Sequence, residues 1–209
     1  MSYYPIFLDM AGRRCAVIGG GVVTERKVTG LLAAGAAITV ISPKHTEQLS
    51  SMAQKGEIKL VCRAYRPGDL DGYELAFVAT GNEEVAAAVF REGRERGVWV
   101  NAADDPAYCD FILPAVVRRG DLTVAVATGG ASPALSRLVR EELESYFSED
   151  YAVLAEVAAD ARKELKRDAL HVNAETWHSA LDTNLRQLIH EGKRAEAKAY
   201  LLKKLGATV

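Results

Sequence analysis

From Arg14 to Gly97 the chain alternates between short apolar runs rich in β-branched residues and stretches whose apolar residues recur at helical spacing. This alternation is typical of a parallel sheet whose strands are joined by crossover helices. We expect strands at residues 15–18, 37–41, 58–62, 75–79 and 98–100. We expect helices between them at about 23–34, 45–54 and 83–96. The pattern therefore predicts an open α/β domain.

A glycine-rich loop of the form G-x-G-x-x-T joins the first strand to the first helix, from Gly19 to Thr24. In this position Gly19 permits a tight turn, and Gly21 lets the backbone approach a pyrophosphate without a Cβ in the way. The helix N-terminus offers N–H groups and a partial positive charge to the phosphates. The loop favours a dinucleotide-binding Rossmann domain over the alternative of a plain glycine-rich turn.

The second strand ends in Ser42-Pro43-Lys44, without the acidic residue that many NAD sites place against the ribose hydroxyls. Ser42 can hydrogen-bond a ribose, Lys44 can pair with a 2′-phosphate, and both can equally begin a solvated turn. The residues alone thus leave NAD and NADP open. Thr80 and Gly81 follow the fourth strand at the same carboxyl edge of the sheet, where ligands of such folds bind.

The pattern changes after Pro114, where an apolar strand at 122–127 is followed by a Gly-Gly turn and a long helix from about Ser132 to Tyr146. Beyond Tyr151 only helical spacing remains. We therefore expect a Rossmann domain over residues 1–113, a small α+β unit over 114–149 and a helical C-terminal domain over 150–209.

Composition and charge exclude several classes of protein. The 26 basic and 28 acidic residues leave a net charge of −2, so no global charge points to nucleic acid or an anionic membrane. The three cysteines lie far apart, and neither they nor the four histidines have metal-ligand spacing, so we expect no disulfide framework and no permanent metal site. With no signal peptide or apolar span in view, we expect a soluble cytoplasmic protein.

Several longer motifs carry a more specific signal than the glycine loop. They are Leu8-Asp9, Val17–Lys27, Val78–Thr80, Asn101–Asp104, Cys109–Phe111 and Thr128–Pro133. Together they resemble the precorrin-2 dehydrogenase family, which includes the dehydrogenase/ferrochelatase module of sirohaem synthases. The resemblance covers the Rossmann domain and the unit after it, and the helical tail is compatible with it.

The resemblance implies an NAD-binding Rossmann domain, a dimerisation region over 114–149, and an active site in the cleft between the domains. It implies the NAD-dependent oxidation of precorrin-2 to sirohydrochlorin, a step of sirohaem synthesis, by a homodimer. Some members of the family also insert Fe²⁺ or Co²⁺ as a substrate, and others do not.

Asp104 matches the carboxylate that the family uses in catalysis, where it would accept the proton that the macrocycle loses. Alternatively, Asp104 and Asp105 simply shape the turn before Pro106. The predicted cofactor contacts are Gly19, Gly21, Val22, Val23, Ser42, Pro43, Thr80, Gly81 and Asn101.

Precorrin-2 carries a rim of carboxylates, so its pocket should contain basic side chains. Four arginines flank the Gly129-Gly130 turn, namely Arg118, Arg119, Arg137 and Arg140. The predicted substrate contacts are Thr128, Gly129, Ser132, Arg118 and Arg137. Ser132 can instead cap the helix that follows it.

Two other functions fit parts of the sequence. A Rossmann regulatory module that senses NAD(H) without turnover would need no catalytic carboxylate. A dehydrogenase of a small hydroxy acid would need a His/Asp catalytic pair, and none is evident. Turnover of precorrin-2 would separate the main hypothesis from both alternatives.

Overall fold

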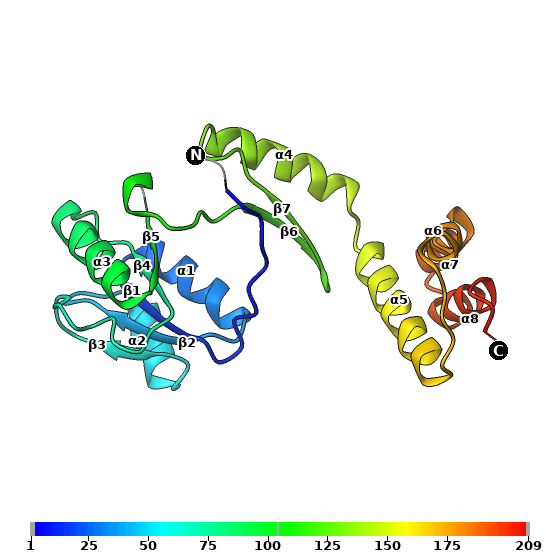
Figure 1. Ribbon diagram of the computed structural model, residues 1–209, viewed down its shortest axis with the longest axis horizontal. Coiled ribbons are helices and arrows are strands. Elements are labelled where there is room, and N and C mark those ends of the chain that lie inside the picture. Colours follow the sequence, from blue (N-terminus) through cyan, green and yellow to red (C-terminus); the bar gives the residue numbers. More distant parts are fainter. Residues whose placement is uncertain (1–2, 104, 208–209) are drawn as a thin grey trace. The chain divides into compact units, whose positions relative to one another are not determined.

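The computed structural model describes residues 3–103 and 105–207 (Figure 1). The chain divides into two compact units, Met1–Leu113 and Pro114–Val209. In the part of the chain that the structure describes, no helix is long and apolar enough to cross a membrane.

The first unit is built on a five-stranded parallel sheet in the order β3-β2-β1-β4-β5. Its strands are β1 (Arg14–Ile18), β2 (Ala37–Ile41), β3 (Lys59–Val61), β4 (Leu75–Val78) and β5 (Trp99–Ala102). This order is that of the first five strands of the Rossmann fold, and it confirms the predicted fold class. It places the carboxyl end of β1 between those of β2 and β4.

Helices pack on both faces of this sheet (Figure 1). They are α1 (Val22–Ala33), α2 (Glu47–Gln54) and α3 (Glu83–Arg96), and a 3₁₀ helix, η1 (Pro106–Tyr108), follows β5. Val28 of α1 and Leu49 of α2 pack against Val17 in one core cluster. Val89 of α3 packs against Ile18 in the other. Successive residues of β1 are thus buried on opposite faces, which explains its uninterrupted apolar sequence.

The second unit begins with an antiparallel hairpin and a long helix. These are β6 (Ala115–Arg119), β7 (Leu122–Val126) and α4 (Pro133–Tyr146). The remaining helices are α5 (Asp150–Arg167), α6 (Ala174–Ala180), α7 (Thr183–His190) and α8 (Arg194–Lys204). Val157 of α5, Leu185 of α7 and Leu201 of α8 are buried together in a third core cluster. That residues 114–149 form a dimerisation region separate from 150–209 stays a prediction.

Helix α5 ends in a Schellman motif whose left-handed residue is an alanine. Ala169 has a φ of 54°, and it is the only non-glycine residue with positive φ in the described segments. Its N–H donates to the Lys166 carbonyl at 3.3 Å, and the N–H of Leu170 donates to the Leu165 carbonyl at 2.9 Å. The motif turns the chain sharply, so that Leu170 and the residues after it can lead into α6.

We predict that Ala169→Gly stabilises the protein, because a left-handed conformation costs an L-residue roughly 1–2 kcal/mol that glycine avoids. The greater freedom of glycine in the unfolded chain offsets part of this gain, by roughly 0.5–1 kcal/mol. We expect the unfolding midpoint in far-UV circular dichroism to rise by about 1–4 °C. Ala159→Gly, in the interior of the same helix, should lower the midpoint, and a fall for Ala169→Gly would contradict the geometry of the motif.

Candidate functional site

The carboxyl edge of the parallel sheet brings together the loops that follow β1, β2, β4 and β5. Gly19 has a φ of 124°, and a Cβ at this position would lie 2.3 Å from the carbonyl oxygen of Ala79, after β4. A Cβ on Gly20 would lie 2.1 Å from the carbonyl oxygen of Lys44, after β2. The turn after β1 therefore passes so close to both neighbouring loops that only glycine fits.

Gly21 differs from these two glycines because its packing does not require a glycine. Its φ is −88°, and a Cβ built on it meets no atom within 4 Å. It is the N-cap of α1, and no side chain caps this helix. Val22 and Val23, in the first turn, are 63% and 38% exposed. The loop thus leaves an open cradle in front of backbone N–H groups, as a pyrophosphate requires.

The loops beside this cradle already use some of their polar groups. Ser42 is buried, and its hydroxyl donates to the Lys44 carbonyl at 2.6 Å, so that its lone pairs remain for a ligand. Pro43 is exposed beside it. The Thr80 hydroxyl accepts from the N–H of Asn82 at 3.0 Å. Gly81 is exposed, with space around its Cα.

Asn101 lies at the end of β5, and it is 6% exposed. Its side-chain carbonyl accepts from Lys27 Nζ of α1 at 3.1 Å, and its amide donates to the Phe111 carbonyl at 2.9 Å. Lys27 also lies over the ring of Phe77, with Nζ 5.4 Å from the centroid. The contact of Asn101 with a cofactor stays a prediction. Its two hydrogen bonds connect α1 and the segment after β5 to the sheet. The Val17–Lys27 motif includes Lys27, but the sequence alone does not predict its hydrogen bond to Asn101.

Asp104, the predicted catalytic residue, lies outside the described residues. Its neighbours are held in place on both sides: the N–H of Ala103 donates to the Val78 carbonyl at 2.8 Å. The Asp105 carboxylate accepts from the N–H of Ala107 at 2.9 Å and caps η1. Asp105 therefore shapes the turn before Pro106, as the alternative interpretation of the two aspartates has it.

Cys109 forms hydrogen bonds to the turn between β5 and η1. Burial raises the pKa of its thiol above the ordinary value. The neutral S–H faces two carbonyl oxygens, that of Ala102 at 3.2 Å and that of Asp105 at 3.3 Å. This cysteine is therefore a structural donor in the turn between β5 and η1.

The turn between β7 and α4 contains the predicted substrate residues Thr128, Gly129 and Ser132. The Thr128 hydroxyl accepts from the N–H of Ser132 at 3.0 Å. The Ser132 hydroxyl accepts from the N–H of Leu135 at 3.1 Å, so Ser132 caps α4 as the alternative prediction had it. Gly129 is exposed at the tip of the turn, with a φ of 63°.

The four arginines that flank this turn in the sequence lie in different places. In the hairpin register Ala115 pairs with Val126 and Arg119 with Leu122, so Arg118 and Arg119 lie at the opposite end of β7 from Gly129. Arg119 donates to the Phe147 carbonyl at 2.7 Å, and Arg140 pairs with Glu144 at 2.5 Å. Arg118 and Arg137 are exposed, and within residues 3–103 and 105–207 neither forms an ion pair. The two arginines predicted as substrate contacts are therefore available to a ligand.

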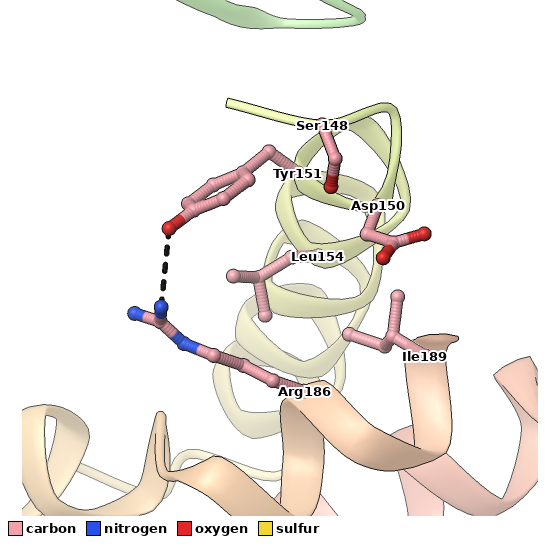
Figure 2. Close-up of a pocket in the computed structure, with 6 residues that line it drawn as sticks. All are labelled: Ser148, Asp150, Tyr151, Leu154, Arg186 and Ile189. Carbon is pink, nitrogen blue, oxygen red and sulfur yellow. Dashed lines mark hydrogen bonds between the residues drawn. The ribbon is translucent and has the colours of Figure 1, made fainter. Parts of the chain in front are cut away.

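Two cavities of the second unit contain none of the predicted site residues. The smaller, of about 90 Å³, lies between α5 and α7 (Figure 2). There the Arg186 guanidinium donates to the Tyr151 hydroxyl at 3.1 Å. A volume of this size holds a few water molecules, since sites for small molecules usually measure roughly 300–1,000 Å³. The larger cavity lies between α5 and α6.

Comparison with known proteins gives two family matches. Residues 6–115 match a family described as putative NAD(P)-binding, and residues 119–146 match the central region of a sirohaem biosynthesis protein. The first match agrees with the cradle at Gly21 and supports a nicotinamide dinucleotide as cofactor.

Individual relatives agree with these matches. The chain is 38% identical to a sirohaem synthase of Nitrosococcus oceani over 96% of its own length and 43% of the relative's. It is 37% identical to one of Chromobacterium violaceum over 99% and 44%. It thus spans less than half the length of these relatives. A solved precorrin-2 dehydrogenase, SirC, superimposes with a TM-score of 0.75 at 28% identity, covering 98% of this chain and 99% of that one.

We predict that Gly21→Asp keeps the fold and loses the cofactor. Aspartate is a favoured N-cap residue, so α1 should be as stable as before. Its carboxylate would occupy the cradle and repel a pyrophosphate, weakening NAD binding in calorimetry by at least about tenfold. Gly20→Ala should instead lower the unfolding midpoint. Unchanged NAD affinity in Gly21→Asp would show that the pyrophosphate binds elsewhere.

Proposed function

The chain belongs to the precorrin-2 dehydrogenase family, and from this we propose that it oxidises precorrin-2 to sirohydrochlorin with NAD. The observation that carries the proposal is the cradle at Gly21, which is open although nothing in the packing requires a glycine there. NAD would accept the hydride that precorrin-2 loses. The reaction also releases one proton from the macrocycle.

The first unit would bind the cofactor along the carboxyl edge of its sheet. The N–H groups at the start of α1 would hold the pyrophosphate, with Gly19 and Gly21 shaping the loop. The hydroxyl of Ser42 would accept from a ribose hydroxyl. The choice of NAD over NADP rests on the family, since Lys44 is exposed where a 2′-phosphate would reach it.

The proposed base is Asp104, on the strength of the family motif. Its chemistry suits the reaction, because a carboxylate near the reacting carbon can accept the released proton or stabilise developing positive charge. The segment that carries it is anchored before and after by Asn101 and Asp105. Such anchoring would keep a base in position, and positioning contributes much of an enzyme's rate enhancement.

The second unit would supply contacts to the substrate. Arg118 and Arg137 are exposed and have no competing carboxylate among the described residues, so they can form charge-assisted hydrogen bonds with the carboxylates of precorrin-2. Arg137 lies early in α4, so it would act together with Gly129 and the hydroxyls of Thr128 and Ser132. Arg118 lies at the other end of β7 and would meet a separate carboxylate. Insertion of Fe²⁺ or Co²⁺ into the product, with the metal as substrate, is a further step that some family members perform.

We also propose that the chain is a homodimer. Leu135 and Leu138 are 49% and 52% exposed, and they lie three residues apart on α4, where side chains share one face. Exposed apolar side chains grouped on one face usually mark an interface. Covering this face with a second copy would remove it from water.

For the reaction, we predict that Asp104→Asn lowers the rate of sirohydrochlorin formation from freshly made precorrin-2 and NAD by at least about 100-fold, the low end of general-base effects. NAD affinity should stay unchanged. Asp105→Asn is the matched control, because an asparagine oxygen can still cap η1, and it should retain most of the activity.

Three outcomes of this assay would contradict the proposal in different ways. Full activity in Asp104→Asn would assign the base to another residue. NAD binding by the unaltered chain without turnover of precorrin-2 would favour an NAD(H)-sensing module. Turnover of small hydroxy acids, followed by NADH absorbance, would point to a different dehydrogenase.

For the oligomeric state, we predict a dimer in analytical ultracentrifugation that Leu138→Glu converts to a monomer, because the interface would then bury an unpaired charge. Arg137→Glu is the control, because this exposed residue lies one and two positions from the leucines and so does not share their helix face, and it should leave the dimer intact. A monomeric unaltered chain would overturn the proposal.

A further inference from the structure

The larger cavity of the second unit is an open groove of about 910 Å³ between α5, α6 and the loop that joins them. Its lining comes from one face of α5, at helical spacing, and from the chain that turns back after the Schellman motif. The lining residues are Ala158, Ala159, Arg162, Leu165, Lys166, Ala169, Leu170, His171, Val172, Ala174 and Trp177. We call it the α5–α6 groove.

Apolar side chains form much of the surface of the α5–α6 groove. Leu165 is 4% exposed and belongs to the third core cluster, against which Val172 and Trp177 pack while still reaching the groove. Leu170, also in the lining, is 42% exposed. The small side chains of the alanines keep the groove wide. An apolar surface that includes an indole ring can stack against a planar ring system.

The charged groups of the groove all carry one sign. They are Arg162 and Lys166; His171 also lines the groove, and no Asp or Glu does. Arg162 and Lys166 lie one turn apart on α5, where like charges destabilise a helix by about 0.2–0.5 kcal/mol. In a chain of net charge −2, this is a local concentration of positive charge.

Neighbouring cations on the same helix are compensated, and those of the groove are not. Lys163 pairs with Asp160 at 3.6 Å, and Arg167 pairs with Asp168 at 3.0 Å. Neither Arg162 nor Lys166 forms an ion pair with any residue of the described ranges 3–103 and 105–207. The groove therefore combines an apolar surface with two exposed, uncompensated cations.

The geometry points to a binding site for a carboxylate-bearing tetrapyrrole in the α5–α6 groove. The macrocycle would lie against Trp177 and the leucines, and its carboxylates would pair with Arg162 and Lys166. This inference rests on the proposed function, which brings such macrocycles to the chain. None of the lining residues belongs to the proposed catalytic or substrate-contact set, so the groove is a second tetrapyrrole site.

The size and shape of the groove favour this ligand over simpler anions. Its volume of about 910 Å³ lies near the top of the range for small-molecule sites, about 300–1,000 Å³, whereas a lone phosphate or carboxylate would leave the apolar surface wet. An acidic peptide would also meet the cations, and it is the competing occupant that the experiment must exclude.

The test is calorimetric titration of the full chain with uroporphyrin III, a stable octacarboxylate macrocycle. We expect Arg162→Glu/Lys166→Glu to lose one binding site per chain, or to weaken it at least tenfold. Lys163→Glu/Arg167→Glu is the matched control, because it makes the same change in charge on the same helix outside the groove, and it should keep this site. Added salt should weaken binding at the groove.

Comparison ligands separate the outcomes. A tetracationic porphyrin of similar ring size should not bind at the groove. Equal uroporphyrin stoichiometry and affinity in both double variants would overturn the inference. Binding of a polyglutamate peptide that depends on Arg162 and Lys166, with no such dependence for uroporphyrin, would overturn it in favour of a peptide site.

The rate of precorrin-2 oxidation separates this inference from the proposed function. At saturating precorrin-2, Arg162→Glu/Lys166→Glu should oxidise it within twofold of the unaltered rate. If the chain binds uroporphyrin at the groove but does not oxidise precorrin-2, the proposed function is overturned and the inferred binding site in the groove stands. If the chain oxidises precorrin-2 but its uroporphyrin binding does not depend on Arg162 and Lys166, the inferred groove site is overturned and the proposed function stands.

Discussion

The close passage of the turn after β1 between the loops that follow β2 and β4 is the constraint on which the first unit depends. A single Cβ on Gly19 or Gly20 would overlap the backbone carbonyls of Ala79 or Lys44. This tight passage places the N-cap of α1, Gly21, at the centre of the carboxyl edge, where no side chain caps the helix and a Cβ would meet no atom within 4 Å. The cofactor cradle is therefore a by-product of how densely the three loops pack.

A second layer of contacts extends this arrangement to the segment after β5. Asn101 accepts from Lys27 and donates to Phe111, so one buried amide connects α1, β5 and the chain beyond η1. Buried polar groups are costly unless they are paired, and this one is paired on both sides. The same helix that begins at the cradle thus also supports, through Lys27, the end of β5.

The second unit uses its polar groups differently. The Ser132 hydroxyl caps α4 beside the Gly129 turn. Arg119 and Arg140 are occupied elsewhere in the unit by a carbonyl and a carboxylate, whereas Arg118 and Arg137 are exposed. In the helical part, most cations near α5 are matched by acids, and the uncompensated pair at Arg162 and Lys166 therefore stands out. Both places thus have exposed cations that form no ion pair within the described residues, and it is there that we propose anionic ligands bind.

The sequence by itself determined the parallel α/β fold, the position of the glycine loop and the family, because local periodicity and short motifs carry that information. It predicted α3 residue for residue, since Asn82 and Gly97 mark its two ends. It did not determine that packing requires a glycine at Gly20 but not at Gly21. Nor did it determine that Lys27 donates to Asn101 or that Asp105 caps η1. The sequence also could not show that Lys163 and Arg167 form ion pairs whereas Arg162 and Lys166 line the groove. These distinctions depend on which atoms meet across distant segments, and only the tertiary structure decides that.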